Sequence, residues 1–113
     1  MKDNEILDME SGRGLDNEIK EKVMNGEDGF YSRDISAAWN VVEKLNEGGW
    51  RIDMVSSQEE KIVSGVKMIK GQPISLNYLS SNVKSNNLPE AICKAALLIF
   101  NNLDQINKIK TNK

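Results

Sequence analysis

The sequence predicts an α+β domain whose elements follow the order helix, helix, three antiparallel strands, helix, with the helices packed on the sheet as an α/β/α sandwich. Apolar residues recur every three or four positions between residues 11 and 47 and again from residue 88, which is the period of amphipathic helices. Between these stretches the apolar period is two, which is typical of strands. A chain of 113 residues allows one domain, expected over residues 11–106 between a flexible segment at 1–10 and a frayed tail at 107–113.

The first predicted helix occupies residues 11–24. Its apolar residues Leu15, Ile19 and Val23 recur every four positions, with charged residues between them. We expect the intervening carboxylates, Asp16 among them, to form the solvated face. The pair Asn25-Gly26 ends this helix, because both residue types accept the left-handed conformation found at helix C-termini.

The second predicted helix has the clearest apolar pattern in the chain. Either Ser32 or Asp34 is its N-cap, since both side chains accept hydrogen bonds from the first free N–H groups. The pair Gly48-Gly49 closes it. Its apolar stripe follows the i, i+3, i+4, i+7 spacing and consists of Ile35, Ala38, Trp39, Val42 and Leu45.

Three strands are predicted after this helix, at residues 50–55, 61–69 and 74–78. In the first, apolar residues alternate with Arg51, Asp53 and Val55, and the second places Ile62, Val66 and Met68 on one face. Short connections between the three indicate an antiparallel meander. The sheet needs helices packed on it, because a bare apolar face would lie in water.

The last predicted helix begins at Leu88-Pro89-Glu90, since proline suits the first helical position and glutamate the positive end of the helix dipole. Residues 97–100 are apolar in succession, so apolar side chains point in every direction around this helix. We expect a domain this small to cover one side of it, and the uncovered side predicts a homo-oligomer. The expected buried stripe is Ile92, Ala95, Ala96, Ile99, Leu103 and Ile106.

Composition excludes several classes of function. The chain has no His, which removes imidazole-based nucleophile activation and the usual catalytic zinc sites. Its one cysteine, Cys93, has no partner for an intramolecular disulfide and suits a reducing compartment. A net charge of −2 argues against binding to duplex nucleic acid. The longest apolar run, residues 95–100, is far shorter than the roughly 20 residues of a membrane span. We therefore expect no enzyme activity, no cofactor or metal, and no membrane association.

The segment 30–34, which leads into the second helix, is the best candidate for ligand contact. Here Arg33 offers a guanidinium for a phosphate or carboxylate, and Tyr31 offers a ring for stacking. Ser32 and Asp34 stand where free N–H groups at a helix start hold an anion. The alternative is structural: Ser32 and Asp34 cap the helix, while Phe30 and Tyr31 staple the entering chain to the core.

Several segments together resemble a known family of small phage proteins. They are Gly12-Arg13, Leu15-Asp16, Lys22-Val23-Met24, Tyr31-Ser32, Asp34-Ile35, Ala37-Ala38-Trp39, Val42-Glu43-Lys44-Leu45, Pro89, Ala91-Ile92-Cys93 and Ala95-Ala96-Leu97. In these segments the chain is similar to the phage ABA sandwich domain family, over residues 5 to 103. The resemblance implies a helix–sheet–helix sandwich and a viral origin, and it implies no catalytic residue.

A phage protein of this kind is expected in the cytoplasm of the infected bacterial host. The leading hypothesis is a non-enzymatic counter-defence protein that sequesters a small nucleotide immune signal. Its phosphates would meet Arg13, Arg33 or Lys22 at a helix start, and its base would stack on Tyr31 or Tyr78. The alternatives are an inhibitor that binds a host defence protein directly and a minor phage structural or assembly protein.

Overall fold

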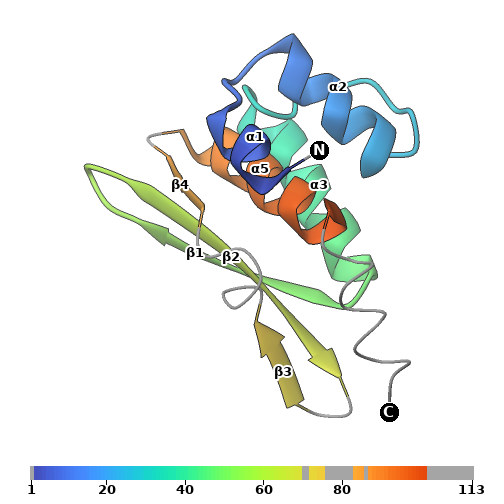
Figure 1. The fold of residues 1–113 in the computed structure, drawn as a ribbon, viewed down its shortest axis with the longest axis vertical. Coiled ribbons are helices and arrows are strands. Elements are labelled where there is room, and N and C mark those ends of the chain that lie inside the picture. The colour runs from blue at the N-terminus through green and yellow to red at the C-terminus, as the bar shows by residue number, and fades with distance from the viewer. Residues whose placement is uncertain (1, 70–71, 76–82, 86, 102–113) are drawn as a thin grey trace.

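The computed structural model describes residues 2–69, 72–75, 83–85 and 87–101 (Figure 1). The helices in these ranges are α1 (Asp3–Asp8), α2 (Arg13–Lys22), α3 (Ile35–Glu47) and α5 (Leu88–Asn101). The strands are β1 (Trp50–Ser56), β2 (Lys61–Ile69), β3 (Gln72–Ser75) and β4 (Val83–Ser85). The α+β class and the antiparallel pairing are confirmed. The predicted element order is not, because α1 and β4 add a helix and a strand.

The sheet is built around β2. One edge of β2 pairs with β1, and its other edge pairs with β3 towards one end and with β4 towards the other. The third predicted strand lies only partly in β3, which ends at Ser75, because Leu76 and Tyr78 fall outside the described residues. Within the described ranges, none of the helices is long and apolar enough to cross a bilayer.

The register of β1 on β2 decides which face meets the helices. Met54 lies opposite Val63, and Ile52 lies opposite Gly65. Val63 is in the hydrophobic core, and Ile52 and Met54 pack against it. Ile62 and Val66 share one face of β2, as predicted, and it is the face opposite to Val63. The face turned to the helices also contains Gly65 and Lys67, so its composition does not mark it as the inward one.

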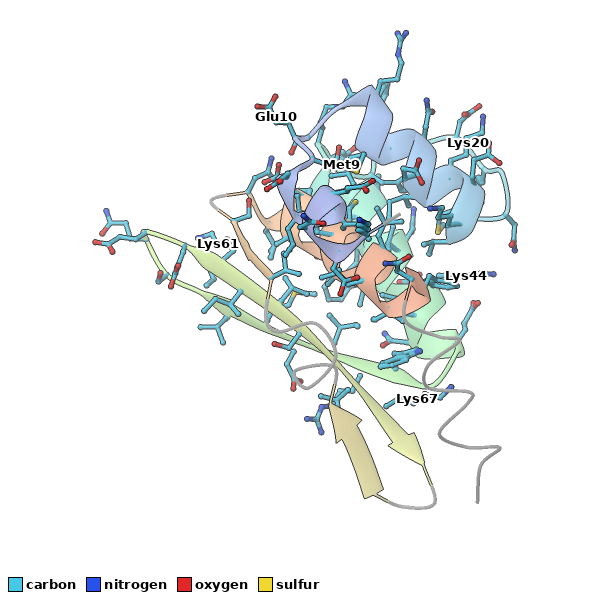
Figure 2. All side chains as sticks on the ribbon, viewed as in Figure 1. Met9, Glu10, Lys20, Lys44, Lys61 and Lys67 are labelled. Atoms are coloured by element: carbon cyan, nitrogen blue, oxygen red, sulfur yellow. The ribbon has the colours of Figure 1, made fainter. Side chains whose placement is uncertain are left out.

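Trp50 and Lys67 face each other at the start of β1. The indole of Trp50 is buried, and the Lys67 ammonium lies 5.7 Å from the centre of its ring, at the position labelled in Figure 2. A cation over an aromatic face is an attractive contact, so Lys67 covers the indole while its charge stays near water.

The described part of the molecule is layered as helix, helix and sheet, which differs from the predicted α/β/α order because two of the helices pack on another helix and not on the sheet. Helices α3 and α5 pack on the sheet, and α1 and α2 pack on the far side of α5 (Figure 1). Every residue of α5 from Ala91 to Ile99 is buried. The surplus apolar face expected on this helix is therefore covered within the chain, by the second layer of helices. An uncovered side of α5 therefore does not support a homo-oligomer, and the oligomer itself remains a prediction.

The N-terminal segment was predicted to be flexible, whereas the structure places the helix α1 in it. Ile6 of α1 is 1% exposed and belongs to the core, and the Lys94 ammonium donates a hydrogen bond of 2.8 Å to the Leu7 carbonyl. Ile6 and Leu7 are neighbours in a short acidic stretch and give no helical period. Helix α1 packs here because α5 offers Ile6 an apolar surface.

Helix α3 begins and ends where the sequence indicated. The Asp34 carboxylate accepts a hydrogen bond of 2.9 Å from the Ser36 N–H, which makes Asp34 the N-cap. The buried stripe is Ala38, Val41, Val42 and Leu45. Ile35 and Trp39 were expected in this stripe, yet they are 48% and 50% exposed. They lie one turn apart, so α3 presents an apolar patch to solvent.

Candidate functional site

The candidate site is organised by Asp16, a carboxylate in the first turn of α2 that is only 5% exposed. It accepts hydrogen bonds from the Ser32 N–H at 2.7 Å and from the Ser32 hydroxyl at 2.6 Å. Its second oxygen accepts from Nε and Nη2 of Arg33 at 3.1 and 2.7 Å. Because two donors of the guanidinium meet one charged oxygen, both the position and the orientation of Arg33 are restrained.

Ser32 connects this carboxylate to the start of α2. Its side chain is fully buried, and its hydroxyl oxygen accepts the N–H of Gly12, the N-cap of α2, at 2.9 Å. The chain then turns, because the N–H groups of Arg33 and Asp34 both donate to the Phe30 carbonyl, at 3.1 and 2.9 Å. The segment that precedes α3 is therefore bonded both to α2 and to itself.

Tyr31 anchors the same segment from beneath. Its ring is 2% exposed, and its hydroxyl donates a hydrogen bond of 2.6 Å to the Glu27 carbonyl. The ring lies directly against Gly29, where a Cβ would come within 2.7 Å of the Tyr31 Cζ, so the position requires glycine. Burial raises the pKa of the Tyr31 hydroxyl, and the Glu27 carboxylate adds to the effect, so this group stays a neutral donor.

Phe30 lies on the outside of the turn and is 63% exposed. The Arg33 guanidinium carbon lies 4.7 Å from the centre of the Phe30 ring, close enough for cation–π contact. Together the two side chains form one wall of a hollow with a volume of about 380 Å³. We call it the arginine hollow, and its lining residues are Arg13, Asp16, Asn17, Asp28, Gly29, Phe30 and Arg33.

Among the described residues, the ion pairs around the arginine hollow leave one lining cation without a carboxylate partner. Asp16 is paired with Arg33, and Asp28 is paired with Lys20 at 2.9 Å. The hydrogen bond from Lys20 to Asp28 raises the pKa of the Lys20 ammonium, which keeps that partner charged. In the part of the chain that the structure describes, no ion-pair partner accompanies Arg13. The hollow is therefore modestly electropositive.

The structure separates the candidate residues into groups. Arg13 and Arg33 come together at the arginine hollow, while Tyr31 and Ser32 lie behind its wall and Asp34 caps α3. Lys22 is not part of it: its ammonium pairs with Glu18 at 3.0 Å, and it lines a different hollow beside Ile6 and Leu97. Tyr78 lies outside the described residues. Of the staple expected from Phe30 and Tyr31, only Tyr31 packs in the core.

Sequence reasoning missed Asp16, which was assigned to the solvated face. A signal was present, because position 16 stands three residues before Ile19 and seven before Val23, on the same side of the helix. An acidic residue on an apolar stripe requires a buried partner, and Arg33 with Ser32 supplies it.

A second, larger hollow of about 680 Å³ lies between the 24–31 loop and α3. Carboxylates dominate its charged lining, and the ammonium of Lys44, which is labelled in Figure 2, pairs with Glu47 at 3.6 Å. The lining residues are Met24, Asn25, Gly26, Glu27, Asp28, Gly29, Tyr31, Ala37, Asn40, Glu43, Lys44 and Glu47. This acidic lining would repel an anion.

Nucleophilic and metal chemistry finds little support in the described ranges. No group of three or more His, Cys, Asp or Glu side chains there has an arrangement suited to a metal ion. Cys93 is fully buried in α5, and burial, followed by the nearby carboxylates of Asp16 and Glu90, raises the pKa of its thiol far above the usual range. The thiol is therefore a core group.

Comparison with known proteins identifies the class. The family model of the phage ABA sandwich domain matches residues 5–97, and the chain belongs to this family. No curated protein and no solved structure shows significant similarity to the chain. The family description names a fold and a phage source, and it assigns no ligand and no reaction.

Proposed function

We propose that this protein binds a small nucleotide in the arginine hollow and acts by holding it. In the cytoplasm of an infected bacterium, a phage protein of this kind would sequester a nucleotide immune signal and so counter the host defence. The observation that carries the proposal is the juxtaposition of Arg13, Arg33 and the exposed ring of Phe30 around one cavity.

The geometry of Arg33 suits a phosphate. Its ion pair with Asp16 uses Nε and Nη2, so Nη1 lies outside that pair. A guanidinium held in this way loses little side-chain entropy when it binds an anion. Arg13 adds a second cation whose charge is not neutralised by a described neighbour.

Phe30 supplies the part of the site that recognises a ring. An aromatic side chain that is 63% exposed leaves most of its apolar surface in water, and stacking against a base would cover it. Base–aromatic stacking is worth roughly 1–3 kcal/mol and tolerates any base. Phosphate contact and stacking on adjacent residues favour a nucleotide over a simple anion.

Binding without chemistry fits the side chains at this site. Asp16 is fully engaged by Ser32 and Arg33, and the tyrosine hydroxyl is bonded to a backbone carbonyl. The other carboxylate of the lining, Asp28, is paired with Lys20. Arg13, Asn17 and Phe30 do not serve as proton-transfer groups near neutral pH. We therefore propose a stoichiometric binder that leaves its ligand unchanged.

Titration calorimetry with a panel of cyclic and linear nucleotides tests the proposal. We expect binding by the intact protein and at least a tenfold loss of affinity in both Arg13→Ala and Phe30→Ala, because each removes one exposed contact. Lys22→Ala is the matched control, since Lys22 is a partly exposed cation of α2 away from the hollow. Absence of heat with every nucleotide, or equal loss in the control, would refute the assignment.

The exposed patch on α3 favours a second candidate function, direct binding to a host defence protein. Ile35 and Trp39 lie one turn apart and are each about half exposed. Tryptophan is enriched among the residues that dominate protein interfaces. With a purified defence protein as target, Trp39→Ala would abolish binding and Arg13→Ala would not. If instead Arg13→Ala abolishes nucleotide binding and Trp39→Ala does not, the arginine hollow is the functional site.

A further inference from the structure

The strand β1 is an edge of the sheet. It pairs with β2 along one side over its full length, Trp50–Ser56, and β3 and β4 both pair with the opposite edge of β2 (Figure 1). Within the described ranges, no strand pairs with the outer side of β1. Alternate backbone N–H and C=O groups of a seven-residue strand therefore face outward, in position to pair with another strand.

The composition of β1 does not protect this edge. Natural edge strands are commonly blocked by proline, by bulges or by lysines, whose like charges repel a second copy. Between Trp50 and Ser56 there is no proline, glycine or lysine, and the register with β2 runs without a bulge. The charged residues of β1 are Arg51 and Asp53, which have opposite signs.

Arg51 and Asp53 lie on the face of the sheet turned away from the helices. Their side chains are 63% and 50% exposed, and they pair with each other at 3.0 Å. They flank Ile52 symmetrically, one residue on each side. The order cation, apolar residue, anion is self-complementary, because an antiparallel copy of the strand presents the anion opposite the cation.

We propose that the partner of this edge is a second copy of the chain, paired antiparallel along β1 with Ile52 opposite Ile52. A two-fold axis perpendicular to the sheet relates the copies, as in an isologous dimer, and it keeps both helical layers on the same face. Arg51 then lies opposite Asp53 of the partner subunit, and this pair occurs twice. On the inner face, Trp50 lies opposite Met54 of the partner subunit.

Neighbouring registers are disfavoured by charge. Centring the pair on Asp53 places two aspartates directly opposite each other, and centring it on Arg51 does the same with two arginines. Like charges in directly opposed positions destabilise a strand pair, whereas opposite charges stabilise it. Directly opposed residues of an antiparallel pair point to the same side of the sheet. The two copies therefore keep their helices on one face only if the two-fold axis passes through a residue, as it does in these three registers. Among these three registers, the one centred on Ile52 alone places opposite charges together.

Charge reversal tests the interface with the full chain. Sedimentation equilibrium should show a dimer for the intact protein. Arg51→Asp and Asp53→Arg should each raise the dissociation constant at least tenfold, because each makes both cross-strand pairs like-charged. Mixing these two single variants should restore a dimer containing one copy of each, and the double variant R51D/D53R should dimerise again by itself.

Glu21→Arg is the control for the change of charge, since Glu21 is exposed on α2 and should leave the dimer intact. Far-UV circular dichroism of every variant establishes that the fold is kept. The proposal is overturned if the intact protein is a monomer at concentrations near 100 µM. It is equally overturned if the single reversals leave the dimer unchanged, or if mixing them restores nothing.

Discussion

The buried carboxylate of Asp16 accepts two hydrogen bonds from Ser32, one from its backbone N–H and one from its hydroxyl. Asp16 lies in α2 and Ser32 lies two residues before the cap of α3, so these bonds join the two helices near their starts. Arg33 is the next residue, and it takes its orientation from the same carboxylate. The arginine hollow therefore depends on a buried polar contact beneath the surface.

Removing this carboxylate should destabilise the protein. Asp16→Ala leaves the buried N–H of Ser32 without its acceptor and removes the partner of Arg33. The Ser32 hydroxyl keeps only its longer contact with the Gly12 carbonyl, at 3.3 Å. We expect a loss of about 2–3 kcal/mol in the free energy of unfolding, with the lower end reflecting the partial exposure of Arg33. Urea denaturation followed by the fluorescence of the buried Trp50 measures it.

Glu18→Ala is the matched control, because Glu18 is also an α2 carboxylate paired with a cation. Its partner Lys22 is partly exposed, so we expect a change within about 0.5 kcal/mol. Equal effects of the two substitutions would show that Asp16 is no more than a surface ion pair.

Two glycines should respond to alanine in opposite directions. In Gly29→Ala, the new Cβ falls 2.7 Å from the Tyr31 ring and forces it to move, which should cost about 1–3 kcal/mol. In Gly14→Ala, the nearest atom to the new Cβ is 3.9 Å away and the residue lies in α2, so a gain of up to about 1 kcal/mol is expected. Thermal and urea unfolding of both variants checks the signs.

The order of α1 can be measured through its single core residue. Ile6→Ala should lower the free energy of unfolding by about 2–4 kcal/mol, because a side chain that is 1% exposed leaves a cavity against α5. Leu7→Ala removes a neighbouring side chain that is 41% exposed and should cost less than about 1 kcal/mol. A negligible effect of Ile6→Ala would show that α1 is not docked in solution.

The fold could be predicted as far as local periodicity reaches. The stripe of Leu15, Ile19 and Val23 and the cap at Asp34 are local features, and the structure has both. The number of layers is not local. Covering α5 on every side requires α1, whose one buried residue, Ile6, is uninformative until the surface that buries it is known. The same limit applies to Ile35 and Trp39. The period of an apolar stripe does not show how much of its width the neighbouring elements will cover.

The site was predictable in part for the same reason. Arg33 and Arg13 were candidates from their residue type, and their meeting at one hollow depends on the turn that Ser32 and Asp16 fix. Lys22 had equal chemical merit and lies elsewhere, because one helix presents positions 13 and 22 in different directions. Asp16 was overlooked because a carboxylate within a helix is usually solvated, and its partner is 17 residues away in the chain.

The buried thiol of Cys93 should make stability fall with rising pH. Burial raises the pKa of Cys93 in the folded state above its ordinary value of 9.0. The unfolded chain therefore loses this proton at a lower pH than the folded chain does. The stabilisation is complete below pH 9.0 and is lost above it, by up to about 1.4 kcal/mol per pH unit. Tyr31, whose pKa is also raised by burial, adds to the loss above pH 10.0.

Urea denaturation of the intact protein at pH 8, 9 and 10 should show this decline in stability. The variant Cys93→Ala tests whether the thiol causes it. The variant should be less stable at pH 8, because it leaves a small cavity in α5, but its stability should change less between pH 9 and 10. The thiol of the intact protein should also react with iodoacetamide at the rate of unfolding and not at that of a free thiol. Rapid alkylation under native conditions, or an unchanged pH dependence in Cys93→Ala, would contradict the burial of this group.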